Sequence, residues 1–311
     1  MGRMTDSADR DLRWGVTKRL EFIDFRLFWD GSFNRKDLVD FFGISEQQAS
    51  SDIAQYQARA DRNLAYDRSL KSFVRSEGFV PEFIGPFSDR YLLQLVAVQN
   101  GWMSASDTWF SETPPIDVVG FIKRRSTSPS NLIRILDAIK QNAALEIEYA
   151  SLTGSPAGKR TIAPHSFLFA TGCWYVRAWS KEHNEFRDYS LNRIASAALF
   201  GPSSVTADLD LEWHHTMELI LIPNPKLEKL KQAAVAAEYD MVDEELRVPS
   251  RLSAAFYIIN EHNLDVEPGV LKPEKQQLVL KNLDEVVQTR EVVRRLSIDA
   301  LRKNKGAGTG L

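Results

Sequence analysis

Cysteine is nearly absent from the sequence, which has one residue, Cys173, in 311. A single thiol excludes an intramolecular disulfide and a thiolate metal cluster, and it suits a reducing compartment. The five histidines also lack the spacing of metal ligands. We therefore expect a cytoplasmic protein that uses no metal and no other cofactor.

Long apolar runs and catalytic motifs are missing as well. No segment approaches the length of a membrane helix, and the first residues, MGRMTDSADRD, are too polar for a signal peptide. The sequence contains no Gly-rich phosphate loop, no nucleophile elbow and no HExxH motif. We expect neither a membrane partner nor enzymatic activity.

The chain is long enough for several domains. Its 311 residues predict two or three domains with separate cores, and contents of 43% hydrophobic and 26% charged residues are typical of globular proteins. From residue 203 onward, 14 Lys and Arg residues are outnumbered by 18 Asp and Glu residues. The net charge of -3 therefore leaves room for a basic patch earlier in the chain.

The N-terminal segment has the pattern of a helix-turn-helix. After a first helix, predicted over 14–29, Asn34 can cap a helix over 35–42, and Gly43 supplies a turn. Ser45 and Gln48 form a capping box that begins a third helix, ending near Ala58. Two short helices joined by such a turn are typical of DNA-binding domains, in which the second helix enters the major groove.

A strand, a turn and a second strand follow over 64–75, as in the wing of a winged helix. Short polar side chains on the third helix can approach base edges, and basic wing residues can meet phosphates. The same pattern occurs in proteins that never bind DNA, and residues 1–80 are balanced, with 13 basic and 13 acidic residues. The candidate DNA-binding residues are Ser45, Gln47, Gln48, Ser50, Ser51, Gln55, Arg68, Lys71 and Arg75.

The segment that follows is predicted to connect two domains. Helices are expected over 88–99, over 116–123 and from Asn131, with a loop over 104–115 and a basic, Ser-rich linker over 124–130. The apolar stripes of these helices suit either the pairing of two subunits or packing on their own domains.

Three consecutive strands are predicted between Lys159 and Ile194, separated by turns at Thr171-Gly172 and His183-Asn184. Alternation places Trp174, Val176 and Ala178 on one face, and Tyr175, Arg177 and Trp179 on the other. The first set suits a core.

Basic residues recur among these strands. Residues 151–200 hold six Lys and Arg residues and three Asp and Glu residues, a local charge of +3 in an acidic chain. Guanidinium groups beside aromatic rings are typical of a site for phosphate or nucleic acid. A solvated, charged sheet face has the same composition.

The same residues resemble a known family. Pro164-His165, the run Trp174-Tyr175-Val176-Arg177-Ala178, Arg187 and Leu191-Asn192-Arg193-Ile194 resemble the WYL domain, a small Sm-like β-barrel of bacterial regulators. Val176 stands where that family usually has Leu. Tyr149 to Leu152 resembles the first barrel strand of the BrxR and CapW type, which represses phage-defence operons. A winged helix followed by a WYL domain is the layout that those regulators share.

The resemblance implies a ligand-sensing domain. For WYL-like proteins the expected ligand is a nucleic-acid fragment or a nucleotide, and the residue types are compatible with phosphate binding. The candidate ligand-binding residues are Tyr149, Ser151, His165, Tyr175, Arg177, Arg187 and Arg193, with His165 and Arg177 first.

A third unit is predicted after Gly201-Pro202. Strands are expected over 217–222, 246–248 and 276–280, and helices over 226–238, 250–262 and 284–302. This α+β unit resembles the extension that follows many WYL domains. The last residues, 304–311, are predicted to be a disordered tail.

The expected fold is therefore an α+β multidomain protein with a winged helix-turn-helix, a central Sm-like WYL barrel and a C-terminal α+β extension. The expected division is 1–85 for the DNA-binding domain, 86–130 for a helical linker or dimerisation segment, 131–202 for the WYL domain, 203–305 for the extension and 306–311 for the tail.

Two functions of different classes fit these features. In the first, the protein is a homodimeric, sequence-specific transcription factor, a repressor, that holds a palindromic double-stranded operator. A nucleotide or nucleic-acid ligand at the WYL domain then changes the spacing of the two winged helices, which couples the two sites. In the second, it is an RNA- or single-strand-binding adaptor that uses the Sm-like barrel.

Overall fold

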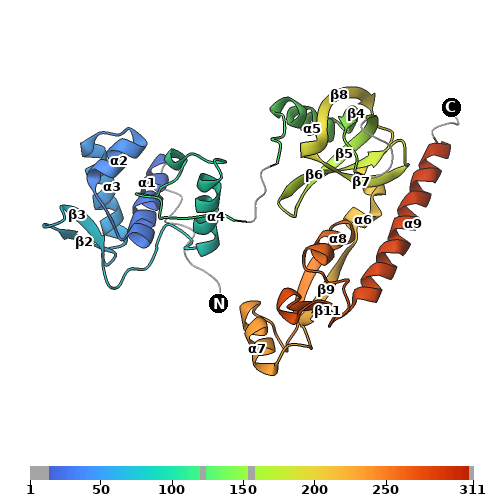
Figure 1. The fold of residues 1–311 in the computed structure, drawn as a ribbon. Coiled ribbons are helices and arrows are strands. Elements are labelled where there is room, and N and C mark those ends of the chain that lie inside the picture. Colours follow the sequence, from blue (N-terminus) through green and yellow to red (C-terminus); the bar gives the residue numbers. More distant parts are fainter. Residues whose placement is uncertain (1–13, 120–123, 153–157, 308–311) are drawn as a thin grey trace. The chain divides into compact units, whose positions relative to one another are not determined.

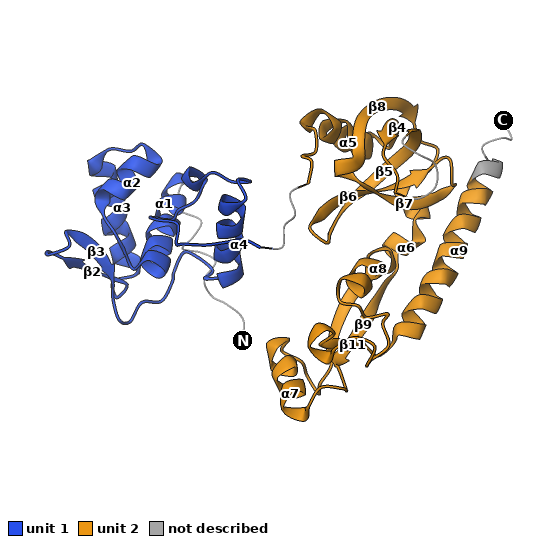
Figure 2. Ribbon diagram, viewed as in Figure 1, with its two compact units in different colours: residues 1–121 blue, residues 122–311 orange. Residues whose placement is uncertain are grey.

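The structure, a computed structural model, describes residues 14–119, 124–152 and 158–307. It divides into two compact units, residues 1–121 and 122–311, coloured separately in Figure 2. No helix among the described residues is both long and apolar enough to span a membrane.

Unit 1 is a small winged helix-turn-helix (Figure 1). It contains α1 (Trp14–Phe25), the π-helical turn η2 (Arg26–Asp30), β1 (Ser32–Phe33), α2 (Arg35–Phe42), α3 (Glu46–Arg59), β2 (Leu64–Asp67), β3 (Ser72–Arg75), α4 (Ser88–Gln99) and η3 (Ala105–Asp107). The three strands form an antiparallel sheet in the order β1-β3-β2. Leu20, Ile23, Leu38 and Tyr56 are fully buried in the core between α1, α2 and α3.

The first residues of α2 and α3 and the last residue of α2 follow from local chemistry. The Asn34 side chain accepts from the Asp37 amide, and the Asp37 carboxylate accepts from the Asn34 amide, so α2 begins with a complete capping box. Gly43 ends α2 with a positive φ of 64°. At α3 the expected box is only half formed. Ser45 accepts from the Gln48 amide, but the Gln48 side chain donates to Asp52 instead.

One predicted helix is wrong over its described part. Residues 116–119 are not helical, although a helix was expected over 116–123. The β-branched Ile116 and Val118, which follow Pro114-Pro115, favour extended backbone at this point. Residues 120–123 lie outside the described residues.

The first part of unit 2 is a five-stranded antiparallel sheet with a helix packed on one face. Its elements are α5 (Pro129–Gln141), β4 (Ala143–Tyr149), β5 (Gly158–Ala170), β6 (Cys173–Ser180), β7 (Glu185–Ser190), η4 (Leu191–Arg193) and β8 (Ile194–Pro202), in the sheet order β7-β6-β5-β4-β8. Among the described residues, the edge strands β7 and β8 do not pair with each other. The expected Sm-like barrel is therefore not confirmed as a closed barrel.

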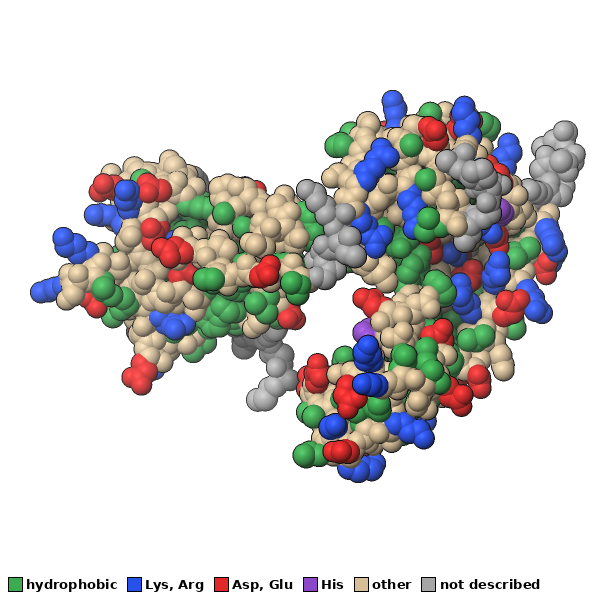
Figure 3. Space-filling model, in the orientation of Figure 1, with side chains coloured by type: hydrophobic (Ala, Val, Ile, Leu, Met, Phe, Trp, Pro, Cys, Tyr) green, Lys and Arg blue, Asp and Glu red, His purple; other side chains and the backbone are tan. Residues whose placement is uncertain are grey.

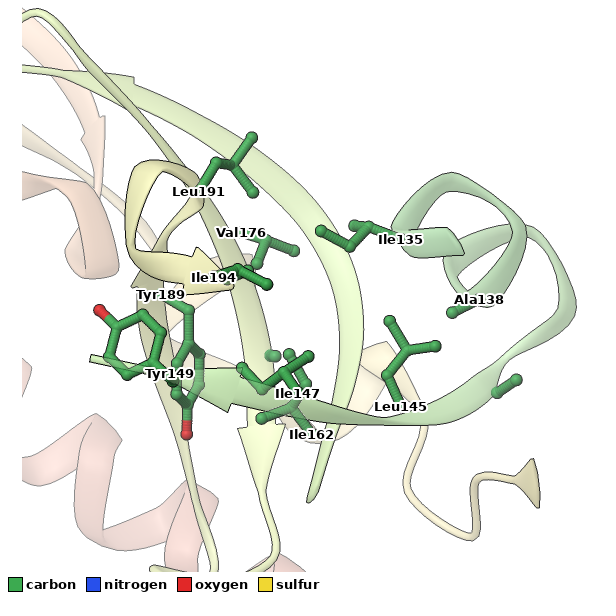
Figure 4. Packing of buried hydrophobic residues seen from close by; sticks show 12 residues of the cluster. Ile135, Ala138, Leu145, Ile147, Tyr149, Ile162, Val176, Tyr189, Leu191 and Ile194 are labelled. Carbon is green, nitrogen blue, oxygen red and sulfur yellow. The ribbon is translucent and has the colours of Figure 1, made fainter. Parts of the chain in front are cut away.

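The two faces of this sheet bury different clusters. Val176 and Ala178 belong to a core with Leu145, Ile147 and Ile135. Figure 4 shows the side chains of Val176, Leu145 and Ile135, from the strands and α5, pointing toward one another. On the other face, Trp179 packs with Phe186, Val205 and Leu301 of the C-terminal helix. The predicted alternation is confirmed for Val176, Ala178 and Trp179, and the second face is covered rather than open. Trp174, which was expected in the core with Val176, is instead 53% exposed, because it lies at the start of β6, beside the hairpin turn.

The rest of unit 2 is a mixed α/β extension. It contains η5 (Ala207–Leu209), α6 (Leu211–His214), β9 (Thr216–Pro223), α7 (Lys229–Glu238), β10 (Leu246–Arg251), α8 (Leu252–Glu261), η6 (Pro273–Lys275), β11 (Leu278–Leu280) and α9 (Leu283–Ala307). The strands pair antiparallel in the order β10-β9-β11. In Figure 1, α9 runs alongside both this sheet and β7. The helix continues four residues into the expected tail, and residues 308–311 lie outside the described residues.

Candidate functional site

A buried ion pair fixes the orientation of α3 in unit 1. The Asp52 carboxylate, 1% exposed, accepts from Arg19 Nε of α1 at 2.6 Å and from Arg19 Nη2 at 3.2 Å. Gln48 Nε2 also donates to Asp52, at 3.0 Å. This face of α3 therefore lies against α1, and the neighbouring face, with Gln47 and Ser51, is exposed.

The predicted DNA-binding residues of α3 lie close together. The side chains of Ser45, Gln47, Gln48 and Ser51 are exposed, and those of Ser50 and Gln55 are half-buried. Gln48 is held by Asp52, and Ser50 Oγ accepts from Arg35 Nη1 at 3.0 Å and donates to the Glu46 carbonyl.

The basic residues of the wing have different environments. Arg68 and Lys71 are exposed in the turn between β2 and β3, and Figure 3 shows Lys and Arg side chains at the wing and over the start of α2. Arg75 Nη1 instead donates to the carbonyl of Phe28 at 2.6 Å. Arg75 therefore joins the wing to η2 and has less freedom to reach a phosphate.

A groove of about 650 Å³ lies between α2, α3 and the wing. Its cationic and aromatic lining includes Arg35, Lys36, Lys71 and Tyr66, and the Tyr66 ring is 55% exposed. Sequence reasoning did not identify Arg35, Lys36 or Tyr66. The sequence did carry a signal for Arg35 and Lys36, which lie in the first turn of α2. Cations at that end of a helix oppose its dipole, so they indicate a role other than helix stability.

In unit 2, Arg177 lies at the centre of a buried ionic cluster between the five-stranded sheet and the extension. Its Nε and Nη2 donate to the two oxygens of Asp210 at 2.7 and 3.0 Å. Nη1 contacts Asp188 on β7 at 3.4 Å, and Nη2 contacts Glu212 of α6 at 3.3 Å. The guanidinium is only 4% exposed, so its charge is balanced by carboxylates of the same chain.

His165 belongs to the same cluster. Its Nε2 lies 3.0 Å from Asp210 Oδ2, and its Nδ1 lies 2.9 Å from the Ser166 hydroxyl. The edges of Phe186 and Trp213 flank the imidazole, with ring centroids at 5.4 and 5.6 Å. Asp210 is therefore a shared partner of the two residues that were first choices for ligand contact.

An outer ring of contacts ties this cluster to the extension. Tyr257 of α8 donates to Asp188 Oδ2 at 3.1 Å, and its ring lies 5.1 Å from that of Tyr175. Arg290 of α9 donates to Glu212 at 3.2 Å. Arg294, one turn further along α9, donates to Glu185 of β7 at 2.7 Å.

Burial and charge compete within the cluster. Desolvation by burial opposes the charge of Arg177, but hydrogen bonding to Asp210 and the three surrounding carboxylates raise the pKa of Arg177 above its usual value. Burial also acts to raise the pKa of Asp210, yet hydrogen bonds from His165 and Arg177 keep that pKa below its usual range. Burial prevails at Asp188, whose pKa is raised. Asp210 is therefore more firmly ionised than Asp188.

The structure brings together three of the predicted ligand residues: His165, Tyr175 and Arg177. Tyr149 instead lies in the apolar core on the other face of the sheet, where its hydroxyl accepts from the Ser190 amide. Arg187 is paired with Glu185 at 2.5 Å. Ser151 and Arg193 are half-buried outside this cluster.

Sequence reasoning missed Asp210, Glu212, Asp188 and Tyr257. Asp210 carries one signal that could have been used, since it precedes a short helix and caps it, accepting from the Trp213 amide at 3.3 Å. Its pairing with Arg177, 33 residues earlier, has no counterpart in local sequence. Residues 14–119, 124–152 and 158–307 contain no group of three or more His, Cys, Asp and Glu residues arranged to hold a metal ion.

Three family profiles match successive parts of the chain. Residues 15–97 match the winged helix-turn-helix domain of the BrxR transcriptional regulator, residues 130–199 match the WYL domain, and residues 216–286 match the C-terminal dimerization domain of the BrxR transcriptional regulator.

Curated relatives match most of the chain. The DNA-binding transcriptional repressor CapW of Escherichia coli (strain KTE188) is 35% identical over 274 residues, which cover 88% of this chain and 91% of that protein. CapW of Pseudomonas aeruginosa is 35% identical over 91% of this chain and 94% of its own length. CapW of Stenotrophomonas maltophilia is 31% identical over 92% of this chain and 95% of its own length.

Proposed function

Because the chain belongs to the family of BrxR and CapW transcriptional regulators, we propose that it is a homodimeric, sequence-specific DNA-binding repressor. The relatives are named as DNA-binding transcriptional repressors, which are not enzymes. In the proposed division of labour, residues 1–85 bind the operator, 86–130 connect, 131–202 sense a ligand and 203–305 pair the subunits. The dimerization profile over 216–286 supports placing subunit pairing in 203–305 and not in the linker, where it was expected.

The observation that carries the proposal is the exposed face of α3 beside a cationic groove. Gln47 and Ser51 present short hydrogen-bonding groups suited to base edges. Arg35, Lys36 and Lys71 line the adjoining groove together with Glu46, and the three cations can neutralise phosphates beside the helix. A helix that contacts bases between flanking phosphate contacts is how helix-turn-helix proteins read duplex DNA.

Dimerisation would set the form of the operator. The profile matched by residues 216–286 is named for dimerization, and a twofold dimer presents two winged helices to two half-sites. The proposed operator is therefore palindromic. We further propose, from the resemblance to BrxR and CapW, that the repressed genes form a phage-defence operon and that a nucleotide or nucleic-acid fragment at the WYL domain releases the operator.

The test is duplex binding by fluorescence anisotropy. A labelled duplex from the region upstream of the gene is titrated with the protein in excess unlabelled, unrelated duplex and across a salt series. Specific binding should survive the competitor at physiological salt. The double replacement Gln47→Ala and Ser51→Ala should weaken it at least about tenfold, because each lost base contact costs about 1–3 kcal/mol.

The matched control is Gln99→Ala, an exposed glutamine at the end of α4, outside the groove. It should bind the duplex as the unchanged protein does. Binding that resists the Gln47 and Ser51 replacements, or that unrelated duplex removes, contradicts the proposal.

One observation favours the second candidate, an adaptor for single-stranded nucleic acid. Phe169 and Trp174 face each other across the β5–β6 hairpin with ring centroids 5.0 Å apart, and each is about half exposed. Exposed aromatic rings can stack with bases of any sequence. In that case Trp174→Ala should abolish binding of labelled oligothymidylate, and the α3 replacements should leave it unchanged.

A further inference from the structure

Asp210 occupies the place where a phosphate would bind Arg177. Its two oxygens take the Nε and Nη2 edge of the guanidinium at 2.7 and 3.0 Å, and Oδ2 also takes His165 Nε2 at 3.0 Å. A planar fork of N–H donors matches a phosphate in the same two-point way as a carboxylate. The donors suited to an anionic ligand are therefore already bound by an anion of the chain itself.

The charge of the cluster makes these two anions mutually exclusive. Three carboxylates, Asp188, Asp210 and Glu212, surround Arg177, and Arg290 is the second guanidinium in contact, through Glu212. A phosphate would add negative charge to a buried site where carboxylates already outnumber guanidinium groups. Like charges in a buried site repel strongly, so an entering anion requires that a carboxylate leave.

Asp210 is the carboxylate that can leave. Asp188 lies within β7, in register with Arg177 on β6, so the sheet holds it in place. Asp210 lies instead on the connection after η5, at the first turn of the four-residue α6. Its movement would not break any strand pairing.

Displacing Asp210 would reach the extension through α6. The Asp210 carboxylate caps α6, the Leu211 amide donates to the Ser297 hydroxyl of α9 at 3.4 Å, and Glu212 pairs with Arg290 of α9. The next strand, β9, belongs to the segment that matches the dimerization profile. The same few residues thus join the anion site to the segment proposed to pair the subunits.

We propose that Asp210 is a built-in competitor of the effector: a phosphate-bearing ligand binds Arg177 and His165 by displacing the Asp210 carboxylate, and this displacement loosens α6 from the WYL sheet and from α9. The inference rests on the proposed function for the role of the ligand. It adds the chemical group that is recognised and the contact that recognition breaks.

The experiment measures binding of short oligonucleotides to the full-length protein and to Asp210→Asn. Three probes separate the sources of phosphate: 5′-phosphorylated trithymidylate, trithymidylate without the terminal phosphate, and thymidine monophosphate. Asparagine keeps the cap of α6 but removes the competing charge, so at least one probe should bind about tenfold tighter or more. The probe with the largest gain identifies the phosphate that enters.

Two controls accompany this variant. Asp208→Asn removes an exposed carboxylate two residues earlier and should leave probe affinity unchanged. Glu212→Gln removes the charge of a second contact of Arg177, and it should tighten binding by a smaller factor. If Asp210→Asn does not melt cooperatively, Glu212→Gln decides the question in its place.

Hydrogen exchange supplies the second readout. Saturating probe should speed exchange at the amides of Trp213, His214 and His215, whose acceptors lie in the first turn of α6. Probe affinity that is the same for the unchanged protein and the decisive variant, absence of binding by every probe, or unchanged α6 exchange at saturation would each overturn the inference.

Duplex binding is measured separately on the same samples. If the unchanged protein does not bind duplex specifically, the proposed repressor function is wrong, but the proposed competition between Asp210 and phosphate is not affected. If the unchanged protein binds duplex specifically but the decisive variant binds the probes no more tightly, the proposed competition is wrong and the repressor function is not affected.

Discussion

The hydroxyl of Tyr56 on α3 donates to the carboxylate of Asp24 on α1, and both side chains are fully buried. The other Asp24 oxygen accepts from three successive amides, those of Glu82, Phe83 and Ile84, at 2.7–3.1 Å. One carboxylate therefore joins two helices of unit 1 to the segment that leads into α4.

Asp24→Ala should destabilise unit 1 by about 3 kcal/mol, because the buried Tyr56 hydroxyl and three part-buried amides lose their acceptor. Asp24→Asn keeps one acceptor oxygen and should cost about half as much. Urea unfolding followed by tryptophan fluorescence gives both values. Equal losses for the two variants would show that the amides of residues 82–84 contribute little.

Asp52→Ala should reduce stability and duplex affinity together. It leaves Arg19 without its buried partner, which costs about 3 kcal/mol, and it removes the contact that orients α3. The measurements are thermal melting and duplex anisotropy. Asp61→Ala, which replaces an exposed carboxylate just after α3, is the control and should change neither. A stable variant with normal affinity would contradict the role given to the pair.

Arg35→Ala and Lys71→Ala should each weaken duplex binding for all sequences alike. A lost phosphate contact releases fewer counterions, so the slope of log affinity against log salt should become shallower by about 1 for each replacement. Arg75→Ala, in which the replaced guanidinium donates to the Phe28 carbonyl, should lower stability more than it changes the slope. If the salt slope is unaltered in the Arg35→Ala and Lys71→Ala variants, these two side chains do not contact the phosphates.

The stability that Asp210 contributes should depend on pH in a defined direction. Its pKa in the folded protein lies below its usual value because His165 and Arg177 donate to it against the effect of burial. The contribution is then fully present above the unfolded pKa of about 3.9 and is lost as the pH falls through the lower, folded pKa. Urea unfolding at pH 7, 5, 4 and 3 gives the free energy of unfolding of the unchanged protein and of Asp210→Asn. The difference between the two should be the same at pH 7 and 5 and should become smaller toward pH 3. A difference that stays constant to pH 3 would contradict the assignment.

The parts of this fold that could be predicted from the sequence are those that local chemistry determines. The bounds of α2 follow from its cap and its glycine turn, and those of both wing strands and of α4 were predicted from the pattern of apolar and polar residues; the structure confirms all of them. Alternation also separated Val176 from Arg177 correctly. These features depend on residues only a few positions apart.

The environment of Arg177 could not be predicted in the same way. Periodicity shows that Arg177 lies on the face opposite Val176, but it does not show what covers that face. The covering groups, Asp210 and Glu212, come from a segment more than 30 residues later. Closure of the barrel could not be predicted from local sequence either, because the pairing of edge strands depends on sheet curvature and not on local pattern.

The attachment of the wing to η2 has a thermodynamic consequence. The Arg75 side chain donates to the Phe28 carbonyl, the Arg75 amide donates to the Gly31 carbonyl, and β1 pairs with β3 directly beside them. A wing held in this way before DNA arrives loses little conformational entropy on binding. The heat-capacity change of operator binding should then correspond to the surface buried, without the excess that accompanies coupled folding.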